Sequence, residues 1–263
     1  MIDRIHPVPA FTDNYIWTLV DQERRLAVVV DPGDAAPVED FLSSQGLTLS
    51  QILITHHHPD HTGGLPQLIT NHAPQVVGPD NARIKGITDV VREGDSVDVL
   101  GVQFSVIEVP GHTLDHIAFF AEHTPEQQAA PILFCGDTLF AAGCGRLFEG
   151  SPEQMYRSLG KLSQLPADTR VYCTHEYTLA NLKFAAAADP DNPDLAERIT
   201  SETRKREQDK PTLPSTIALE LATNPFLRCS DGEVRQRVRQ HQGDSSDDPV
   251  ATFSALRQWK DNF

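Results

Sequence analysis

The densest group of chemically reactive side chains in this 263-residue sequence is the run Thr55-His56-His57-His58-Pro59-Asp60-His61. Four side chains that can bind a metal fall within six residues: His56, His58, Asp60 and His61. Imidazole and carboxylate ligands together suit zinc, iron or manganese, and the lack of thiolates argues against a closed structural zinc site. The alternative is a surface loop that is rich in histidine by chance. Further candidate ligands downstream favour a metal centre over that alternative.

Those downstream candidates each follow a run of residues typical of a strand. His112 follows Val102–Val109, Asp137 follows Ile132–Cys135, and His175 follows Arg170–Cys173. A strand that ends in a turn holds a ligand rigidly, and ligands from several strand ends can converge at one edge of a sheet. Any one of these residues alone would be an ordinary turn or packing residue. Together with the histidine run, they predict one common site.

The set of seven ligands predicts two metal ions, because one ion takes about three or four protein ligands. We expect His56, His58 and His112 on one ion, and Asp60, His61 and His175 on the other. The Asp137 carboxylate can bridge them. The net positive charge would favour a bound hydroxide at neutral pH and would stabilise an oxyanion, with Asp60 and Asp137 as the catalytic residues beside that hydroxide. Such a site hydrolyses an acyl or phosphoryl centre.

The remaining histidines have simpler interpretations. His57 is expected to point away from the metals, while His116 could be either a second layer behind a ligand or a core residue. Four others are expected on the surface or in packing: His6, His72, His123 and His241. The sequence has no GxSxG motif and no catalytic-cysteine signature, so the chemistry requires no serine or cysteine nucleophile.

The elements that must position these ligands change character near residue 174. Before it, short β-rich runs alternate with helix-like segments, which predicts an α+β fold of packed sheets with helices outside. The expected strands are Tyr15–Val20, Leu26–Asp31, Gln51–Thr55, Gln75–Val77, Val97–Leu100, Val102–Val109, Ile117–Ala121, Ile132–Cys135 and Arg170–Cys173. The expected helices are Pro37–Gln45, ended by Gly46, then Gly64–His72, and one capped by Ser151 that runs through Leu162.

Beyond residue 174, prolines separate segments that all have a helical pattern, and no strand run is evident. The expected helices are Thr178–Ala188, Asp194–Gln208, Ser215–Ala222, Gly232–His241 and Pro249–Lys260. We therefore expect two domains, a catalytic domain at 1–174 and a helical domain at 175–263.

Composition and charge exclude several classes of protein. With 39% hydrophobic and 22% charged residues, the chain is neither disordered nor fibrous. The net charge of -15 argues against nucleic-acid binding. No apolar run approaches the roughly 20 residues that cross a bilayer, and the N-terminus lacks the pattern of a signal peptide. The four cysteines form no CxxC pair. We expect a monomer in the reducing cytoplasm, without a membrane partner.

The complete ligand pattern resembles that of the metallo-β-lactamase superfamily, and longer stretches resemble the glyoxalase II, or hydroxyacylglutathione hydrolase, family. The resemblance extends from residue 11 to the C-terminus. It is carried by Phe11-Thr12-Asp13-Asn14-Tyr15, Pro110-Gly111-His112-Thr113, Gly136-Asp137-Thr138-Leu139-Phe140, Gly143-Cys144-Gly145-Arg146, His175-Glu176-Tyr177-Thr178, Asn224-Pro225-Phe226-Leu227-Arg228 and Leu256-Arg257-x-x-Lys260-Asp261-x-Phe263.

The resemblance implies an αββα sandwich followed by a helical glutathione-binding domain. It implies hydrolysis of S-(2-hydroxyacyl)glutathione, such as S-D-lactoylglutathione, to glutathione and D-lactate, the second step of methylglyoxal detoxification. Two divalent ions are implied, zinc first, with iron or manganese as alternatives.

The resemblance also implies which residues bind the substrate. Arg257 and Lys260 would hold a glutathione carboxylate, and Tyr177 would hydrogen-bond the tripeptide. Arg146 stands where many relatives have lysine, and Phe148 where some have tyrosine, so one hydroxyl contact is missing. Arg257 and Lys260 are three residues apart on an expected helix and share a face. Without the resemblance, an ordinary solvated surface would explain that pair.

Several other functions are compatible with parts of the pattern. A thioester or lactone hydrolase with another acyl substrate would use the same ligands. A single-iron glutathione-persulfide dioxygenase is disfavoured by the full ligand set and the helical tail. A secreted β-lactamase would need a signal peptide, and a nuclease would need a basic surface. A binding module without catalysis would be expected to lack some of Asp60, His61, Asp137 and His175, all of which are present.

Overall fold

The computed structural model of the chain describes residues 1–122, 130–242 and 248–263. His123, which we expected to be a surface or packing residue, lies outside these ranges. The chain forms two compact units. The first unit comprises Met1–Glu108, Asp115–Gly136 and Thr169–His175, and the second comprises Val109–Leu114, Asp137–Asp168 and Glu176–Phe263.

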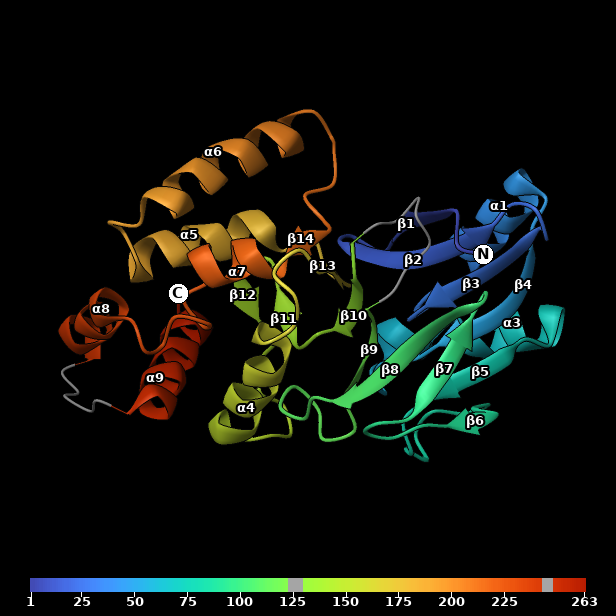
Figure 1. Cartoon of the computed structure of the whole chain (residues 1–263), viewed down its shortest axis with the longest axis horizontal. Helices are drawn as coiled ribbons and strands as arrows, with labels where there is room; N and C mark the ends of the chain where they lie inside the picture. The colour runs from blue at the N-terminus through green and yellow to red at the C-terminus, as the bar shows by residue number, and fades with distance from the viewer. Residues whose placement is uncertain (123–129, 243–247) are drawn as a thin grey trace. The chain divides into compact units, whose positions relative to one another are not determined.

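The first unit contains two sheets (Figure 1). The first sheet has the order β1-β2-β3-β4-β5-β6, antiparallel from β1 to β3 and parallel from β3 onward. Its strands are β1 (Arg4–Ala10), β2 (Asn14–Asp21), β3 (Leu26–Val30), β4 (Thr48–Leu53), β5 (Gln75–Gly78) and β6 (Asp89–Val90). All eight residues of β2 are buried, as expected of a strand that is covered on both faces.

The second sheet in this unit runs β13-β10-β9-β8-β7, with β10 and β13 parallel and the other pairs antiparallel. Its strands are β7 (Ser96–Val99), β8 (Val102–Glu108), β9 (Ile117–Ala121), β10 (Ile132–Gly136) and β13 (Arg170–Cys173). Trp17 of β2 joins the two sheets: its ring meets Tyr172 of β13 edge-on at 4.9 Å, and its Nε1 donates to Cys173 O at 2.9 Å.

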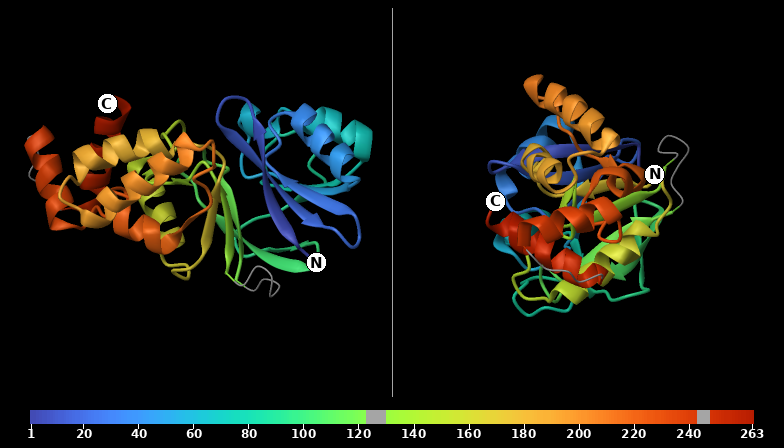
Figure 2. Two further views of the ribbon diagram at one scale, coloured as in Figure 1. Left: turned by 90° about the horizontal axis from the view of Figure 1, so that it is seen from above. Right: turned by 90° about the vertical axis from the view of Figure 1, so that its left-hand side faces the viewer.

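Helices cover the outer face of the first sheet. They are α1 (Ala35–Gln45) and α3 (Leu65–His72), which bury Val38, Leu42, Leu65 and Leu68 against it; the left view of Figure 2 shows these helices on one side of the blue strands. Gly46 ends α1 in the left-handed conformation, with φ at 63°, as predicted. The short helix α2 (Pro59–Thr62) lies between β4 and α3.

The strand β1 was not among the predicted strands, and it contains Pro7 and Pro9, which disfavour a strand. In the structure β1 is an edge strand that pairs only with β2 in the described sheet. An edge strand tolerates proline since its missing N–H groups can face outward.

The second unit is mainly helical. Its elements are β11 (Leu139–Phe140), β12 (Gly143–Cys144), α4 (Pro152–Ser163), α5 (Thr178–Ala188), α6 (Pro193–Glu207), β14 (Ser215–Thr216), α7 (Ile217–Thr223), α8 (Gly232–Gln242) and α9 (Pro249–Asp261). Ser151 caps α4 through a capping box with Gln154, which confirms the predicted helix start. Phe184, Phe226, Phe253 and Trp259 pack their rings together and form much of its core.

One helix prediction in this unit was partly wrong. The segment Ser215–Ala222 was expected to be helical throughout, but Ser215 and Thr216 form β14 and the helix begins at Ile217. The Thr216 side chain accepts the Leu219 N–H and so caps α7.

Residues 137–168 precede the predicted domain boundary in sequence, yet they pack with the C-terminal helices in the second unit. Across the described ranges, no helix is both long enough and apolar enough to span a membrane.

Candidate metal centre

The histidine run begins at a backbone fixed by a buried carboxylate. Asp31, directly after β3, accepts hydrogen bonds from Thr55 N at 2.7 Å and from Thr55 Oγ1 at 2.7 Å. Asp31 adopts a positive φ of 51°, which is unfavourable for a residue with a side chain and is stabilised by these contacts. These contacts fix the position of Thr55, where the turn that follows β4 begins.

Two rings of the run lie against each other. His56 Nε2 is 3.0 Å from His58 Nδ1. The buried His116 ring stacks on His56 with centroids 4.5 Å apart, and His116 Nδ1 lies 3.0 Å from Ile117 O. Of the two alternatives for His116, the structure thus supports a second layer that packs behind a candidate ligand.

The carboxylate of Asp60 faces two other imidazoles. Asp60 Oδ2 lies 3.5 Å from His61 Nε2 and 3.4 Å from His175 Nε2. The opposite nitrogen of each ring is 3.0 Å or less from a second carboxylate, with His61 Nδ1 at 3.0 Å from Asp31 Oδ2 and His175 Nδ1 at 2.8 Å from Asp13 Oδ1. An imidazole oriented by a carboxylate on one nitrogen is typical of a histidine that binds a metal through the other.

In the second unit, His112 and Asp137 are neighbours. His112 Nε2 is 3.5 Å from Asp137 Oδ2, and both side chains are buried. His112 Nδ1 lies 2.8 Å from the Arg146 carbonyl oxygen, which can fix the ring as Asp13 does for His175. Gly145 lets the backbone pack closely here, because a Cβ there would lie 2.0 Å from Asp137 O and 3.1 Å from His112 Nδ1.

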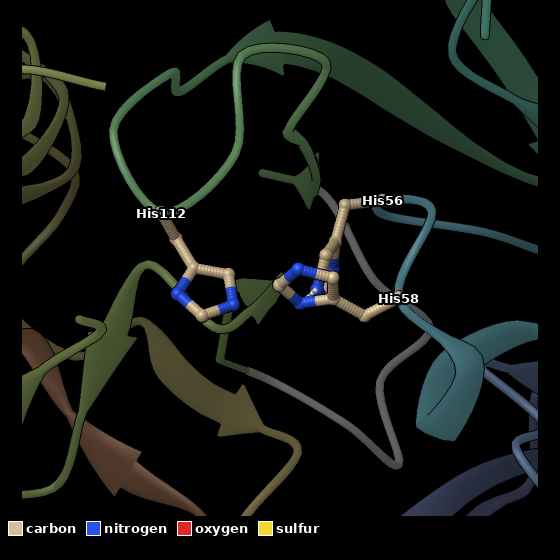
Figure 3. A group of neighbouring side chains, drawn as sticks. All are labelled: His56, His58 and His112. Carbon is tan, nitrogen blue, oxygen red and sulfur yellow. Dashed lines mark hydrogen bonds between the residues drawn. The ribbon is translucent and has the colours of Figure 1, made fainter. Parts of the chain in front are cut away.

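The ligand atoms of the seven predicted residues fall into three groups, and the atoms within each group lie within 4.8 Å of one another. Figure 3 shows the rings of one group, His56, His58 and His112, pointing toward one another. The three groups are His56 with His58 and His112, His56 with His61 and Asp137, and Asp60 with His61 and His175. His56 and His61 each belong to two of these groups. This sharing, together with the imidazole and carboxylate ligands, fits two neighbouring divalent ions. All seven predicted ligands occur in these groups.

His57 has different neighbours. Its Nδ1 lies 2.9 Å from Asp115 Oδ1, and its Nε2 lies 2.7 Å from an Arg83 guanidinium nitrogen. Asn81 Nδ2 donates to the other Asp115 oxygen at 2.7 Å. The ring is thus held by a polar cluster, and His57 falls in a separate group of possible ligands with Asp115 and Glu149.

Sequence reasoning did not assign roles to Asp31, Asp13 or Asp115. Asp13 lies in the quoted stretch Phe11-Thr12-Asp13-Asn14-Tyr15, and Asp31 precedes Pro32-Gly33 at the end of a predicted strand. Both aspartates therefore lie in recognisable sequence patterns, but the side chains that they contact are far away in the sequence.

The predicted substrate-binding arginine is buried. Arg257 is 4% exposed, and its NH1 donates to Cys144 O at 2.9 Å while NH2 donates to Asp261 Oδ1 at 2.9 Å. Its guanidinium also lies 5.1 Å from the centre of the Phe226 ring. The alternative of a solvated surface is therefore wrong for Arg257.

Lys260 lies one turn further along α9. Its Nζ donates to Asn181 Oδ1 and lies 5.6 Å from the centre of the Phe184 ring. Burial, followed by the positive charge of Arg257, lowers the pKa of Lys260 to about 8. The Lys260 side chain therefore loses its positive charge at mildly alkaline pH.

The other candidates for substrate contact lie at the surface of the second unit. Tyr177 is 38% exposed and meets Phe140 edge-on at 5.5 Å. Phe148 is 63% exposed and meets the His112 ring at 5.2 Å. The exposed Arg146 has its Nε 3.7 Å from Asp261 Oδ1.

Two family sequence models together match most of the chain. Residues 16–175 match the metallo-beta-lactamase superfamily, and residues 176–263 match the hydroxyacylglutathione hydrolase C-terminus. A hydroxyacylglutathione hydrolase from Pseudomonas putida strain KT2440 is 54% identical over 261 residues, which covers 99% of both chains.

Solved structures agree with the fold. The crystal structure of ETHE1 from Myxococcus xanthus matches with a TM-score of 0.65 and 25% identity, covering 99% of this chain and 100% of that one. The crystal structure of TTHA1623 in a di-iron-bound form matches with a TM-score of 0.58 and 24% identity, covering 84% of this chain and 100% of that one. The predicted α+β architecture, a metallo-β-lactamase fold followed by helices, is confirmed. The chain therefore belongs to the hydroxyacylglutathione hydrolase family within the metallo-β-lactamase superfamily.

Proposed function

We propose that this enzyme hydrolyses the thioester of S-(2-hydroxyacyl)glutathione, such as S-D-lactoylglutathione, to give glutathione and a 2-hydroxy acid such as D-lactate. This reaction is the second step of methylglyoxal detoxification. The observation that carries the proposal is the presence of all seven ligand residues, in groups of matching chemistry, in a chain that is 54% identical to a hydroxyacylglutathione hydrolase over nearly its full length.

The residues fit a pair of divalent cations. His56, His58 and His112 would hold one ion, Asp60, His61 and His175 the other, and Asp137 would contact both. When bound, such ions lower the pKa of water and polarise the carbonyl group of the thioester. We propose zinc, with iron or manganese as alternatives that imidazole and carboxylate ligands also accept.

The chain's own residues set the geometry of this reaction. Asp13 is hydrogen-bonded to Nδ1 of His175, and Asp31 Oδ2 lies 3.0 Å from Nδ1 of His61. The other nitrogen of each ring faces Asp60. Asp60 and Asp137 are the carboxylates able to accept a hydrogen bond from the attacking water. The water gives up a proton as its oxygen bonds to the acyl carbon, the carbon–sulfur bond breaks, and the glutathione sulfur leaves as a thiolate that takes up that proton.

Substrate recognition is assigned to the helical part of the chain. Lys260 and Arg146 would meet a glutathione carboxylate, with the buried charge of Arg257 behind them, and Tyr177 would hydrogen-bond the tripeptide. Residues 1–174 are proposed as the catalytic domain and 175–263 as the glutathione-binding domain, in a cytoplasmic monomer.

Metal analysis combined with a hydrolysis assay tests this function. Purified protein, chelator-treated protein and protein reloaded with zinc would be assayed with S-D-lactoylglutathione and with a small thioester that lacks the tripeptide. We expect two ions per chain, activity that returns on reloading, and a clear preference for the glutathione thioester. A fully loaded protein that hydrolyses lactones but not glutathione thioesters would contradict the proposal.

A further inference from the structure

The short hairpin formed by β11 and β12, residues 139–144, is bound along its backbone by side chains from the helices of the second unit. Asn224, which follows α7, has its Nδ2 2.9 Å from Gly143 O and 3.2 Å from Phe140 O. Asn181 of α5 donates from Nδ2 to Ala141 O at 2.9 Å. Three carbonyl groups of the hairpin thus depend on two buried asparagines.

Two charged side chains complete these contacts. Glu220 of α7 accepts a hydrogen bond from Ala142 N at 2.8 Å through Oε2, and Arg257 of α9 donates to Cys144 O at 2.9 Å. Ala142 has a positive φ of 56°, a strained conformation for alanine. The contact with Glu220 stabilises this tight turn, so every residue from 140 to 144 has a backbone group bound by a side chain of α5, α7 or α9 or by Asn224.

A buried ion pair holds Glu220 in place. Glu220 is 0% exposed and Arg198 of α6 is 4% exposed, and Arg198 NH2 lies 2.6 Å from Glu220 Oε1. Thr223 Oγ1 and Ser215 Oγ accept further hydrogen bonds from Arg198, at 2.6 Å and 3.1 Å. One oxygen of Glu220 therefore binds the arginine, while the other binds the hairpin and the Asn224 amide at 3.0 Å. Charges buried this deeply are costly unless they are paired. Both terminal nitrogens of Arg198 are hydrogen-bonded, while its buried Nε has no hydrogen-bond partner among the described residues.

The hairpin lies in the sequence between Asp137 and Arg146, both of which belong to the candidate site. Gly145 N donates to Thr138 O at 3.2 Å and closes the base of the hairpin. The carbonyl oxygen of Arg146, next in the chain, contacts His112 Nδ1. A displacement of the hairpin would therefore move the backbone that carries Asp137 and the group that orients His112.

We propose that Asn224 and Glu220 are positioning residues for the metal centre, which act by fixing the 139–144 hairpin and thereby Asp137 and the Arg146 carbonyl group. This inference rests on the proposed role of Asp137 and His112 as metal ligands. In this proposal the helical segment supports the metal centre in addition to binding glutathione. Arg257 of the same segment also donates a hydrogen bond to the hairpin, at Cys144 O.

The test compares Asn224→Ala with a matched control, Asn192→Ala. Asn192 is also buried, its Nδ2 also donates to a backbone carbonyl group, Ala222 O at 2.9 Å, and its Oδ1 also accepts backbone N–H groups. Asn192 caps α6, and its Nδ2 also donates to Asp189 Oδ2 at 2.7 Å. Both variants would be measured for melting temperature, for zinc affinity by chelator competition, and for kcat and KM with S-D-lactoylglutathione.

Both variants should melt at lower temperature, but only Asn224→Ala should bind zinc more weakly, by roughly tenfold or more, as for other residues that support metal ligands. Its kcat should fall and recover in excess zinc. Equal zinc affinities for Asn224→Ala and Asn192→Ala would overturn the proposal. An Asp137→Asn protein that keeps wild-type zinc affinity would overturn the proposed ligand role itself, so the two failures are distinguishable.

A second variant covers the case in which Asn224→Ala does not fold. Gly143→Ala disturbs the hairpin itself, at its contact with Asn181 rather than with Asn224, because the added Cβ would lie 2.7 Å from the Asn181 amide and must displace it. A folded Gly143→Ala protein with weaker zinc binding would support the proposal. Unchanged zinc affinity in that protein would contradict it.

Discussion

Asp13 and His175 are 162 residues apart in the sequence, yet the Asp13 carboxylate lies 2.8 Å from Nδ1 of the His175 imidazole. His175 Nε2 in turn faces Asp60 at 3.4 Å. The Asp13 carboxylate thus orients the His175 ring, and the Asp60 carboxylate lies beside the ring nitrogen on the opposite side. The relationship explains how a loop near the N-terminus can determine the geometry of a ligand that follows β13.

The variant Asp13→Ala should weaken metal binding by roughly 10- to 100-fold, because the imidazole of His175 loses the group that fixes its orientation. Chelator competition would measure the affinity, and kcat should recover in excess metal. Thr12→Ala is a control from the same exposed loop, since Thr12 Oγ1 donates to the other Asp13 oxygen at 3.0 Å. A similar loss of affinity in both variants would show that the loop as a whole matters rather than the Asp13–His175 contact.

Asp137→Asn should reduce activity by orders of magnitude while the fold survives. The amide removes the negative charge that offsets two cations and should raise the pKa of bound water. Metal content, circular dichroism and turnover would be measured on one preparation. Near wild-type turnover with both ions confirmed would exclude Asp137 from this role.

Lys260→Ala should raise KM for S-D-lactoylglutathione about tenfold or more, since a charge-assisted hydrogen bond contributes about 1.5–3 kcal/mol. If the contact is equally strong in the ground and transition states, kcat should change little. Lys183→Ala is a control, because Lys183 is also a lysine beside an aromatic ring, 5.8 Å from the centre of Phe263. Hydrolysis of a small thioester without the tripeptide should be unaffected, and an equal loss on both substrates would argue against glutathione recognition.

The pH dependence of KM should report the same lysine. With a pKa of about 8, Lys260 is charged below that pH and increasingly neutral above it. KM for the anionic substrate should therefore rise above about pH 8 and stay nearly constant below it. In Lys260→Arg the guanidinium remains charged, so the rise should disappear. An unchanged rise in Lys260→Arg would assign the titration to another group.

Arg257→Ala should destabilise the protein as well as weaken substrate binding, because it leaves Cys144 O and Asp261 without a buried donor. The loss in the free energy of unfolding is expected at about 1–3 kcal/mol, measured by chemical denaturation. Arg146→Ala is the comparison, since its side chain is exposed and its pair with Asp261 is longer, at 3.7 Å. Equal stabilities for the two variants would contradict a structural role for Arg257.

The sequence alone determined the features that depend on neighbours along the chain. The run His56–His61 places four ligands on one turn, and the helices after residue 174 follow from periodicity and proline positions. Capping residues located helix ends, as Ser151 does for α4 and Gly46 for α1. These signals are local, since a turn or a cap involves residues only a few positions apart.

The tertiary structure decided what depends on distant partners. Whether Arg257 is solvated or buried cannot be read from α9, because Cys144, 113 residues earlier, supplies the group that binds it. The strand β1 exists despite two prolines because β2 offers it an edge. Asp13, Asp31 and Glu220 acquired roles only through contacts across the fold, and pairing of distant residues is a property of chain topology that no local pattern encodes.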